Sequence, residues 1–377
     1  MVEKRGGGPL QHSGTPSVSL GAPTGDGEPG AHPLRAVRRK GASVVIIHNT
    51  GGEACVEQAA EEEILQTLVA VSDALEGMGR AVRIMTLEPP LSETARLLEG
   101  IPGDAVVFNL FEGFPGNPPS EVQVGLLLES LRLRATGCPP LSMHMGLNKD
   151  LCKEVLSSRG LPPSPGVALR SKADLGRPLH FPFPVFMKPV ADDASHGIGP
   201  ENLVREAMAY SVKAGDLLER FPSGILVEPF LSGREFNCGV IESMEDGPLA
   251  FPPSLVDYSA LPEEHPPVLT FAAKWQPGTP VYDLTPTICP APVDVPTVER
   301  IRALSREAFQ ALRCRGYARI DLREDGEGNL HILEVNPNPD ISPTAGLAKQ
   351  ARALGWDYAD LVCTVLDAAE RGPRWIP

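Results

Sequence analysis

The sequence predicts an α/β protein, in which an open parallel α/β domain precedes a sheet-rich α+β region. Apolar runs alternate with helical periodicity between residues 42 and 113, and strand patterns dominate from about residue 185. Two further strand patterns close to the end of the chain flank a glycine-rich turn and carry polar side chains. Hydrophobic residues make up 42% of the 377 residues and charged residues 22%, a composition typical of globular proteins.

The charge and the cysteines exclude several classes of protein. The net charge of −14 argues against a general affinity for nucleic-acid phosphates, and no apolar run is long enough to cross a membrane. The 7 cysteines are spread singly without a CxxC pair, which favours reduced thiols over disulfides or a zinc site. We therefore expect a cytoplasmic protein with neither nucleic acid nor membrane as a partner.

Residues 1–41 are rich in Gly, Pro, Ser and His and lack apolar periodicity. We expect them to form a disordered tail, although a mis-assigned start codon would give the same pattern. The folded chain is then predicted to consist of an N-terminal α/β domain over residues 42–144 and two further subdomains over 145–227 and 228–377.

The N-terminal domain is predicted from alternating strands and helices. Residues 43–48 form an apolar run of the kind that is buried on both faces of a parallel sheet. A helix over 56–78 follows, with an apolar stripe formed by Ile64, Leu65, Leu68, Val71 and Leu75. Strands over 81–85 and 104–110 and a helix over 92–98 complete the unit. Its ligand crevice should lie at the strand ends, at residues 48–52 and 109–113.

The second region begins with Asn148, a plausible N-cap for a helix over 149–158. The elements expected after it are strands over 185–188, 225–228 and 235–242, and helices over 201–218, 297–313, 346–353 and 357–370. A polar loop over 191–199 contains glycine and small residues, which suits a mobile lid.

The strand patterns over 317–323 and 330–336 predict an antiparallel hairpin. If the turn centres between Glu327 and Gly328, Asp321 faces Glu334 and Arg319 faces Asn336. These four side chains then share one face, because side chains alternate along a strand. The other face carries the apolar side chains of Ile320, Leu322, Leu333 and Val335.

Two carboxylates placed directly across a ladder repel each other unless a cation lies between them. Asp321, Glu334 and the amide of Asn336 offer only oxygen ligands, which suit Mg²⁺. The alternative is an ordinary solvated strand face on which Arg319 merely pairs with Asp321. The pattern alone leaves both interpretations open.

Several motifs in order resemble the D-alanine–D-alanine ligase family of the ATP-grasp superfamily. They are Arg319-Ile-Asp with Glu334-Val-Asn, Phe183–Pro189 with Asp192–Ile198, Ile225–Leu231 with Gly233–Phe236, and Asn148-Lys149 at the start of a helix. The resemblance runs from about residue 42 to the end of the chain. It implies a two-subdomain ATP-grasp fold after the N-terminal domain.

The resemblance also implies the ligands and the residues that bind them. ATP would be the nucleotide, with two Mg²⁺ ions, or Mn²⁺, held by Asp321, Glu334 and Asn336. The residues assigned to ATP are Lys149, Lys188, Ser195, Glu228, Phe230, Leu231, Glu235 and Lys274. Among them, Lys149, Lys188 and Lys274 would contact phosphates, and Glu235 the ribose. The catalytic residues would be Arg319, Ser195 and Lys274.

The implied reaction joins a carboxylate to an amine. A substrate carboxylate attacks the γ-phosphate of ATP to give an acyl phosphate and ADP, and a second substrate's amine then displaces phosphate. Amino acids or peptides would be the substrates, and the resemblance suggests a homodimer. Two alternatives are an L-amino-acid or dipeptide ligase of specialised biosynthesis and an ATP-binding sensor or scaffold without catalysis.

The substrate-selecting positions depart from the family pattern. Asp340 stands where a glycine would offer a backbone N–H to the oxyanion, and Phe111-Glu112-Gly113 replaces a His-Gly segment. Residues 49–53 also lack the family's Gly-Gly-x-Ser-x-Glu pattern. The sequence therefore supports the ATP half of the site better than the D-alanine half.

Overall fold

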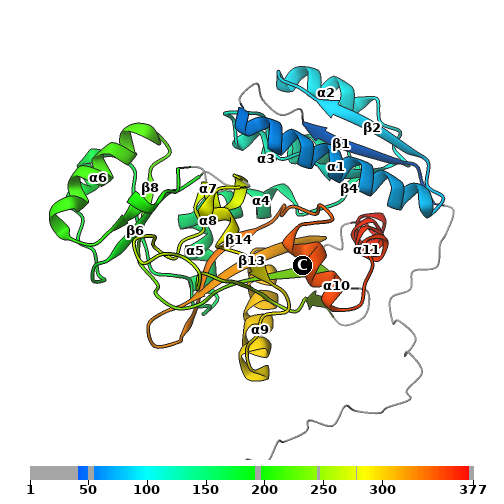
Figure 1. Ribbon diagram of the computed structural model, residues 1–377. Helices are drawn as coiled ribbons and strands as arrows, with labels where there is room; N and C mark the ends of the chain where they lie inside the picture. The colour runs from blue at the N-terminus through cyan, green and yellow to red at the C-terminus, as the bar shows by residue number, and fades with distance from the viewer. Residues whose placement is uncertain (1–40, 50–54, 192–196, 244–246, 277, 373–377) are drawn as a thin grey trace, which may run out of the picture. The chain divides into compact units, whose positions relative to one another are not determined.

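The computed structural model describes residues 41–49, 55–191, 197–243, 247–276 and 278–372 (Figure 1). For residues 55–63 and Trp275 it describes the backbone alone. The predicted tail over 1–41 therefore lies outside the described residues, apart from Gly41. None of the helices in the described ranges is long and apolar enough to cross a membrane.

The first sheet is parallel and four-stranded, in the order β2-β1-β3-β4. Its strands are β1 (Val44–Asn49), β2 (Val82–Leu87), β3 (Val106–Leu110) and β4 (Arg134–Ala135), and its helices are α1 (Cys55–Gly77), α2 (Leu91–Glu99) and α3 (Pro119–Ser130). Every residue of β1 is buried, as a strand covered on both faces must be. The predicted open α/β unit is confirmed, but Leu65 is 58% exposed and does not belong to the buried stripe of α1.

The second sheet is antiparallel and four-stranded, in the order β5-β8-β6-β7. Its strands are β5 (Val167–Leu169), β6 (Val185–Pro189), β7 (Leu203–Val204) and β8 (Ile225–Pro229). Helix α6 (Ala207–Arg220) packs on it through Tyr210, Ala214 and Leu217. Two 3₁₀ turns, η1 (Lys172–Gly176) and η2 (Pro200–Asn202), complete this region.

The helix predicted over 201–218 begins only at Ala207, so the predicted start of this helix was wrong. The buried amide of Asn202 donates to the carbonyl oxygens of Met187 (2.8 Å) and Gly197 (2.7 Å). These bonds tie the segment to β6, and the chain forms η2 and β7 in place of helix.

The third sheet follows the order β12-β11-β9-β13-β14, with β10 paired to β9. Its strands are β9 (Glu235–Glu242), β10 (Pro248–Ala250), β11 (Ser254–Val256), β12 (Thr287–Ile288), β13 (Tyr317–Glu324) and β14 (Leu330–Asn336). The helices of this part of the chain are α4 (Pro140–Leu147), α5 (Lys149–Ser158), α7 (Phe271–Trp275), α8 (Pro280–Asp283), α9 (Val295–Ala311), α10 (Gly346–Ala353) and α11 (Tyr358–Glu370).

The largest apolar core lies under this third sheet. It joins Phe236 and Val240 of β9 and Ile320 of β13 to Leu156 of α5 and Ile301 of α9. Helix α5 thus packs with the third sheet, although the predicted subdomain over 145–227 assigns it to the second. The predicted domain boundaries remain predictions.

The hairpin of β13 and β14 has the predicted register at its polar end: Arg319 pairs with Asn336, and Asp321 with Glu334. A β-bulge follows, so that Leu322 pairs with Ile332. The bulge puts Ile332 in the core, while Leu333 is only half-buried, which corrects the predicted apolar face. It leaves the two carboxylates directly opposed.

Asn148 precedes α5 as predicted, but its side chain does not cap that helix. Its Nδ2 instead donates to the carbonyl oxygen of His144 at 2.8 Å, in the last turn of α4. The asparagine therefore satisfies a carbonyl of the helix before it, and the N-cap mechanism was wrong although the helix bounds were right.

Candidate active site

The polar face of the hairpin is organised around Asp321. Nε and Nη2 of Arg319 donate to its two carboxylate oxygens, each at 2.8 Å. Asn237 on β9 donates to Oδ1 at 2.7 Å, and Asn336 donates to Oδ2 at 3.1 Å. A carboxylate offers about four acceptor positions, so Asp321 is saturated with donors.

Glu334, across the ladder, is in the opposite condition. Among the described residues, its one hydrogen-bonding partner is Nδ2 of Asn336 at 3.4 Å. Burial would raise the pKa of the Glu334 carboxyl, but the positive charges of Lys149, Lys188 and Lys274 outweigh burial and hold this pKa well below its usual range. The predicted lysines, which are far apart in the sequence, therefore act together on one carboxylate.

The donor set suits a hard divalent cation. Nδ2 of Asn336 lies within hydrogen-bonding distance of both Asp321 and Glu334, so the two carboxylates and the amide that would hold a divalent cation lie together. Since Asp321 already accepts four hydrogen bonds, a bound cation would have to displace the Asn336 amide from Oδ2. In the described ranges no cluster of three or more His, Cys, Asp or Glu side chains offers another metal site.

A second buried carboxylate, Glu228 on β8, is held by two lysines. Lys188 Nζ lies 2.7 Å from its Oε2 and Lys153 Nζ lies 2.5 Å from its Oε1, and all three residues are at most 8% exposed. Burial would lower the pKa of Lys188, but Glu228 and Glu334 outweigh burial and raise it. Burial lowers the pKa of Lys153, which also donates to the carbonyl oxygen of Ser164 at 2.8 Å.

Lys153 was missed by the sequence analysis, although a signal for it exists. It follows Lys149 by four residues, so the two lysines share one face of α5. Lys149, Cys152, Lys153 and Leu156 are the buried residues of that helix. Two lysines on the apolar face of a helix indicate buried partners, and this periodicity could have identified Lys153.

Glu235, predicted to contact the ribose, is bonded by two residues that the sequence analysis did not single out. Its Oε2 accepts hydrogen bonds from the hydroxyl of Tyr258 (2.9 Å) and from Nη1 of Arg323 (2.8 Å). Phe230 and Leu231 follow β8, with Leu231 buried and Phe230 half-buried. The Arg323 guanidinium lies 5.0 Å from the centre of the Phe230 ring, which joins the predicted base and ribose positions into one cluster.

The hydrogen-bond donors at the predicted crevice of the first sheet are neutral groups. The backbone N–H of Glu112 donates to Oδ1 of Asn49 at 3.1 Å, so the ends of β1 and β3 are joined as the parallel order requires. Asn338, in the loop after β14, donates to the carbonyl oxygen of Phe111 at 3.1 Å and to Glu121 at 2.7 Å. The hairpin and the N-terminal crevice therefore meet through this loop.

Asp340 lies two residues farther along that loop. Its carboxylate accepts hydrogen bonds from the backbone N–H of Ser342 (2.7 Å) and from the Ser342 hydroxyl (2.9 Å). Burial would lower the pKa of Arg319, but the charges of Asp321 and Glu334, with a smaller contribution from Asp340, raise it. The acid at the predicted glycine position therefore acts electrostatically on the arginine of the hairpin.

Residues 50–53 of the predicted crevice loop and residues 192–196 of the predicted lid, which include Ser195, lie outside the described residues. Lys274 lies in α7, whose first turn is capped by the hydroxyl of Thr270. Its electrostatic effect on the pKa of Glu334 connects it with the hairpin. Of the predicted catalytic residues, Arg319 and Lys274 therefore both lower the pKa of Glu334.

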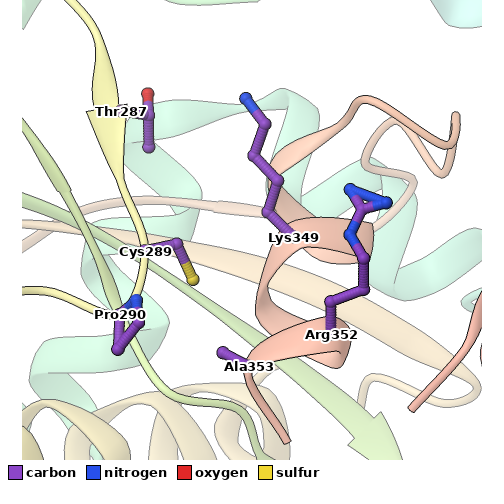
Figure 2. A pocket seen from close by; sticks show the side chains of 6 residues that line it. All are labelled: Thr287, Cys289, Pro290, Lys349, Arg352 and Ala353. Carbon is purple, nitrogen blue, oxygen red and sulfur yellow. The ribbon is translucent and has the colours of Figure 1, made fainter. Parts of the chain in front are cut away.

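A separate cavity of about 360 Å³ lies between β12 and α10, lined by Thr287, Cys289, Pro290, Lys349, Arg352 and Ala353 (Figure 2). The basic side chains of Lys349 and Arg352 extend in similar directions from one side of α10. No predicted nucleotide, metal or catalytic residue lines this cavity. It is therefore distinct from the site on the hairpin face.

Comparisons with known proteins identify the family. A family model described as "D-ala D-ala ligase C-terminus" matches residues 156–367, more than half of the chain. A D-alanine–D-alanine ligase of Sphingopyxis alaskensis is 30% identical over 82% of this chain and 94% of its own length. A second, of Alcanivorax borkumensis, is 32% identical over 65% of this chain and 72% of its own.

The solved structures agree on the fold. The D-alanine–D-alanine ligase of Bacillus anthracis in complex with ATP aligns with 88% of this chain and 98% of its own, with a TM-score of 0.64 and 19% identity. The chain thus has the predicted α/β and ATP-grasp architecture of these structures. From the matched length and the relatives together, the chain belongs to the D-alanine–D-alanine ligase family of ATP-dependent ligases.

Proposed function

We propose that this ATP-dependent ligase uses Mg²⁺ and joins the carboxylate of one amino acid or peptide to the amine of another through an acyl phosphate. The observation that carries the proposal is the convergence of charge on Glu334. Lys149, Lys188, Lys274 and Arg319 come from four separate segments, and all of them lower the pKa of this one carboxyl. Phosphoryl transfer depends on this kind of preorganised positive charge around a metal-binding carboxylate.

The metal ligands in this proposal are Asp321, Glu334 and Asn336. These residues would hold Mg²⁺, as two ions or replaced by Mn²⁺, and the bound metal would supply positive charge that neutralises the negative charge of the phosphates. Arg319 is held by two hydrogen bonds to Asp321, so its guanidinium is fixed beside the reacting groups. There it would stabilise the oxyanion that forms when the amine attacks the acyl phosphate.

The lysines would position the phosphates of ATP. Lys188 and Lys149 are buried at the ends of their elements, β6 and α5, and Lys274 belongs to α7. Ser195, which follows β6 in the sequence, would contact the same phosphates and take part in catalysis. Once the acyl phosphate has formed, the same cations would stabilise the departing phosphate.

The adenosine would lie against β8 and β9. Phe230 and Leu231 would contact the base, Glu228 its amino group, and Glu235 the ribose. Each oxygen of Glu228 already meets one lysine, yet a carboxylate oxygen has a second acceptor position. The adenine amino group would therefore donate a hydrogen bond to a carboxylate that is already paired with two lysines.

Asp340 would influence the choice of substrate. It is held by Ser342 and raises the pKa of Arg319, so its negative charge acts where the amine and the carboxylate would meet. A negative charge there favours the binding of a substrate whose nearby group is an ammonium over one whose nearby group is a second carboxylate. We propose that the substrates are amino acids or peptides. We also propose that the enzyme is cytoplasmic and forms a homodimer.

Trapping of the acyl phosphate tests the proposal. Hydroxylamine attacks an acyl phosphate to give a hydroxamate and phosphate, so ATP, Mg²⁺, hydroxylamine and a productive amino acid should give equal amounts of ADP, phosphate and hydroxamate. The same mixture without the amino acid should give none. ADP formation without hydroxamate for any amino acid or dipeptide in a broad panel would contradict the acyl-phosphate route.

A further inference from the structure

Glu235 presents its two carboxylate oxygens to different surroundings. Oε2 accepts hydrogen bonds from the hydroxyl of Tyr258 at 2.9 Å and from Nη1 of Arg323 at 2.8 Å. Of the residues described by the structure, none donates to Oε1. The carboxylate is thus anchored through one oxygen and keeps the acceptor positions of the other for a different donor.

Arg323 is fixed from several sides. It lies on β13 directly opposite Glu235 in the register with β9, and it is 5% exposed. Its Nη2 donates to the carbonyl oxygen of Pro267 at 2.7 Å. The guanidinium also lies over two aromatic rings, 5.0 Å from the centre of Phe230 and 5.6 Å from that of Tyr258. Because these contacts fix the guanidinium, Glu235 would lose its hydrogen bond to Arg323 if it changed rotamer.

The cluster is not the arrangement that stability alone would favour. Nε of Arg323 is buried and has no hydrogen-bond partner among the residues that the structure describes, and a buried donor without an acceptor destabilises the fold. Among the described residues, the guanidinium otherwise contacts Glu235, the carbonyl oxygen of Pro267 and the rings of Phe230 and Tyr258. A role for Arg323 in orienting Glu235 accounts for a charged residue at this buried position.

We propose that Arg323 and Tyr258 are positioning residues that hold Glu235 with Oε1 directed at a ribose hydroxyl of the nucleotide. This inference rests on the proposed function, because it takes ATP to be the ligand of this cluster. Glutamate loses rotamer freedom when it is ordered, and two donors on one oxygen remove that freedom before the nucleotide binds. The site therefore discriminates ribonucleotides from deoxynucleotides.

The test compares the dissociation constants of ATP, 2′-deoxy-ATP and 3′-deoxy-ATP in the presence of Mg²⁺, measured by calorimetry on the full chain. We expect the wild-type protein to bind ATP roughly tenfold or more tightly than the analogue that lacks the bonded hydroxyl, since a hydrogen bond to a charged group is lost. In Arg323→Met and Tyr258→Phe this ratio should fall to about threefold or less, mainly because ATP binds more weakly.

Two further variants separate positioning from structure. Arg323→Lys can still donate to Oε2 and should keep part of the discrimination. Tyr210→Phe is the control, because Tyr210 is a buried tyrosine whose hydroxyl has no hydrogen-bond partner within the described ranges. This variant should leave the ratio unchanged. If Arg323→Met fails to fold, Tyr258→Phe still tests the proposal, because it removes only one hydroxyl.

The outcomes distinguish this inference from the function on which it rests. Equal weakening of all three nucleotides in Arg323→Met and Tyr258→Phe would assign the two residues a structural role and overturn the inference. A wild-type protein that binds ATP and both analogues equally would also overturn it, while leaving nucleotide binding intact. Failure of the wild-type protein to bind any of the three would instead contradict the proposed function.

Discussion

The two sides of the hairpin differ in how their polar groups are held. On the side of β8 and β9, buried carboxylates meet cations: Glu228 binds two lysines and Asp321 binds an arginine. On the side of the first sheet, the donors are neutral groups, with Asn338 donating to a backbone carbonyl and to Glu121, and Ser342 donating to Asp340. The charged side provides the electrostatics that any acyl-phosphate ligase requires, and the neutral side can vary with the substrate. Substitutions on the two sides should therefore fail in different ways.

The largest effect is expected at Glu334, where the charged side is concentrated. Glu334→Gln keeps the size of the side chain but removes a proposed metal ligand and the counter-charge of the surrounding cations. Turnover should fall at least about 10²–10³-fold. Glu327→Gln is a matched control, because Glu327 is exposed in the turn of the same hairpin. Steady-state rates of ADP formation give the comparison, and near-wild-type turnover in Glu334→Gln would remove the hairpin from the active site.

The next largest effect is expected at Glu228 and its two lysines, and it is a change in the free energy of unfolding. Glu228→Gln would leave Lys153 and Lys188 buried without a carboxylate and should lower the free energy of unfolding by about 3–5 kcal/mol. Lys153→Met leaves the pair of Lys188 and Glu228 intact. Since burial already lowers the pKa of Lys153, its removal should cost only about 1–2 kcal/mol. Urea denaturation measures both, and a larger loss in Lys153→Met would refute this order.

Asp340 tests the neutral side. Asp340→Gly should change the KM for the amino-acid substrate by about tenfold, the effect of roughly 1.4 kcal/mol of altered electrostatics, while the KM for ATP stays the same. Asp340→Asn separates the charge from the shape, because its amide oxygen can still accept from Ser342. If the charge determines the choice of substrate, both variants should change it alike. An altered KM for ATP and an unaltered one for the amino acid would show that the two sides are not separable.

The effect that is smallest near neutral pH is a dependence of stability on alkaline pH. Burial in α5 raises the pKa of the Cys152 thiol to about 11. The folded state therefore binds this proton more tightly than the unfolded state does, with a thiol pKa of about 8.5 in the unfolded chain. The associated stability is present below about pH 8.5 and is lost as the pH rises toward 11, by at most about 1.4 kcal/mol per unit. Thermal unfolding from pH 7.5 to 10.5 should show a shallower decline in Cys152→Ala than in the wild-type protein, and equal slopes would contradict the assignment.

The sequence could predict contacts that follow from side-chain patterns, but not contacts that depend on local backbone geometry. The register of Asp321 and Glu334 followed from alternation and the position of the turn, and the structure has it. The bulge after Asp321 could not be predicted, because Ile332 and Leu333 are both apolar and either could fill the core. Likewise, the hydrogen bonds of Asn202 and Asn338 go to backbone carbonyls, which every residue carries, so no sequence pattern marks them.

At the nucleotide site, residue types in the sequence predicted the candidate ligands of ATP, but they did not predict which of these side chains contact one another. Lys188 and Glu228 were predicted as ligands of ATP, and they are also bonded to each other. Arg323 and Tyr258 had no motif, since their partner Glu235 is distant in the sequence and adjacent only through the sheet. Recognising Arg323 requires the register between β9 and β13, and recognising Tyr258 requires the register between β9 and β11.

The central claim is that the cations around Glu334 serve ligation, and turnover with defined amino acids tests it most directly. ATP, Mg²⁺ and all pairwise combinations of D- and L-amino acids, with dipeptides included, are incubated with the protein, and the products are identified by mass. The proposal predicts that at least one pair gives a dipeptide or tripeptide together with equal amounts of ADP and phosphate. Tight binding of Mg·ATP without a product from any pair would contradict it and would favour a non-catalytic ATP sensor.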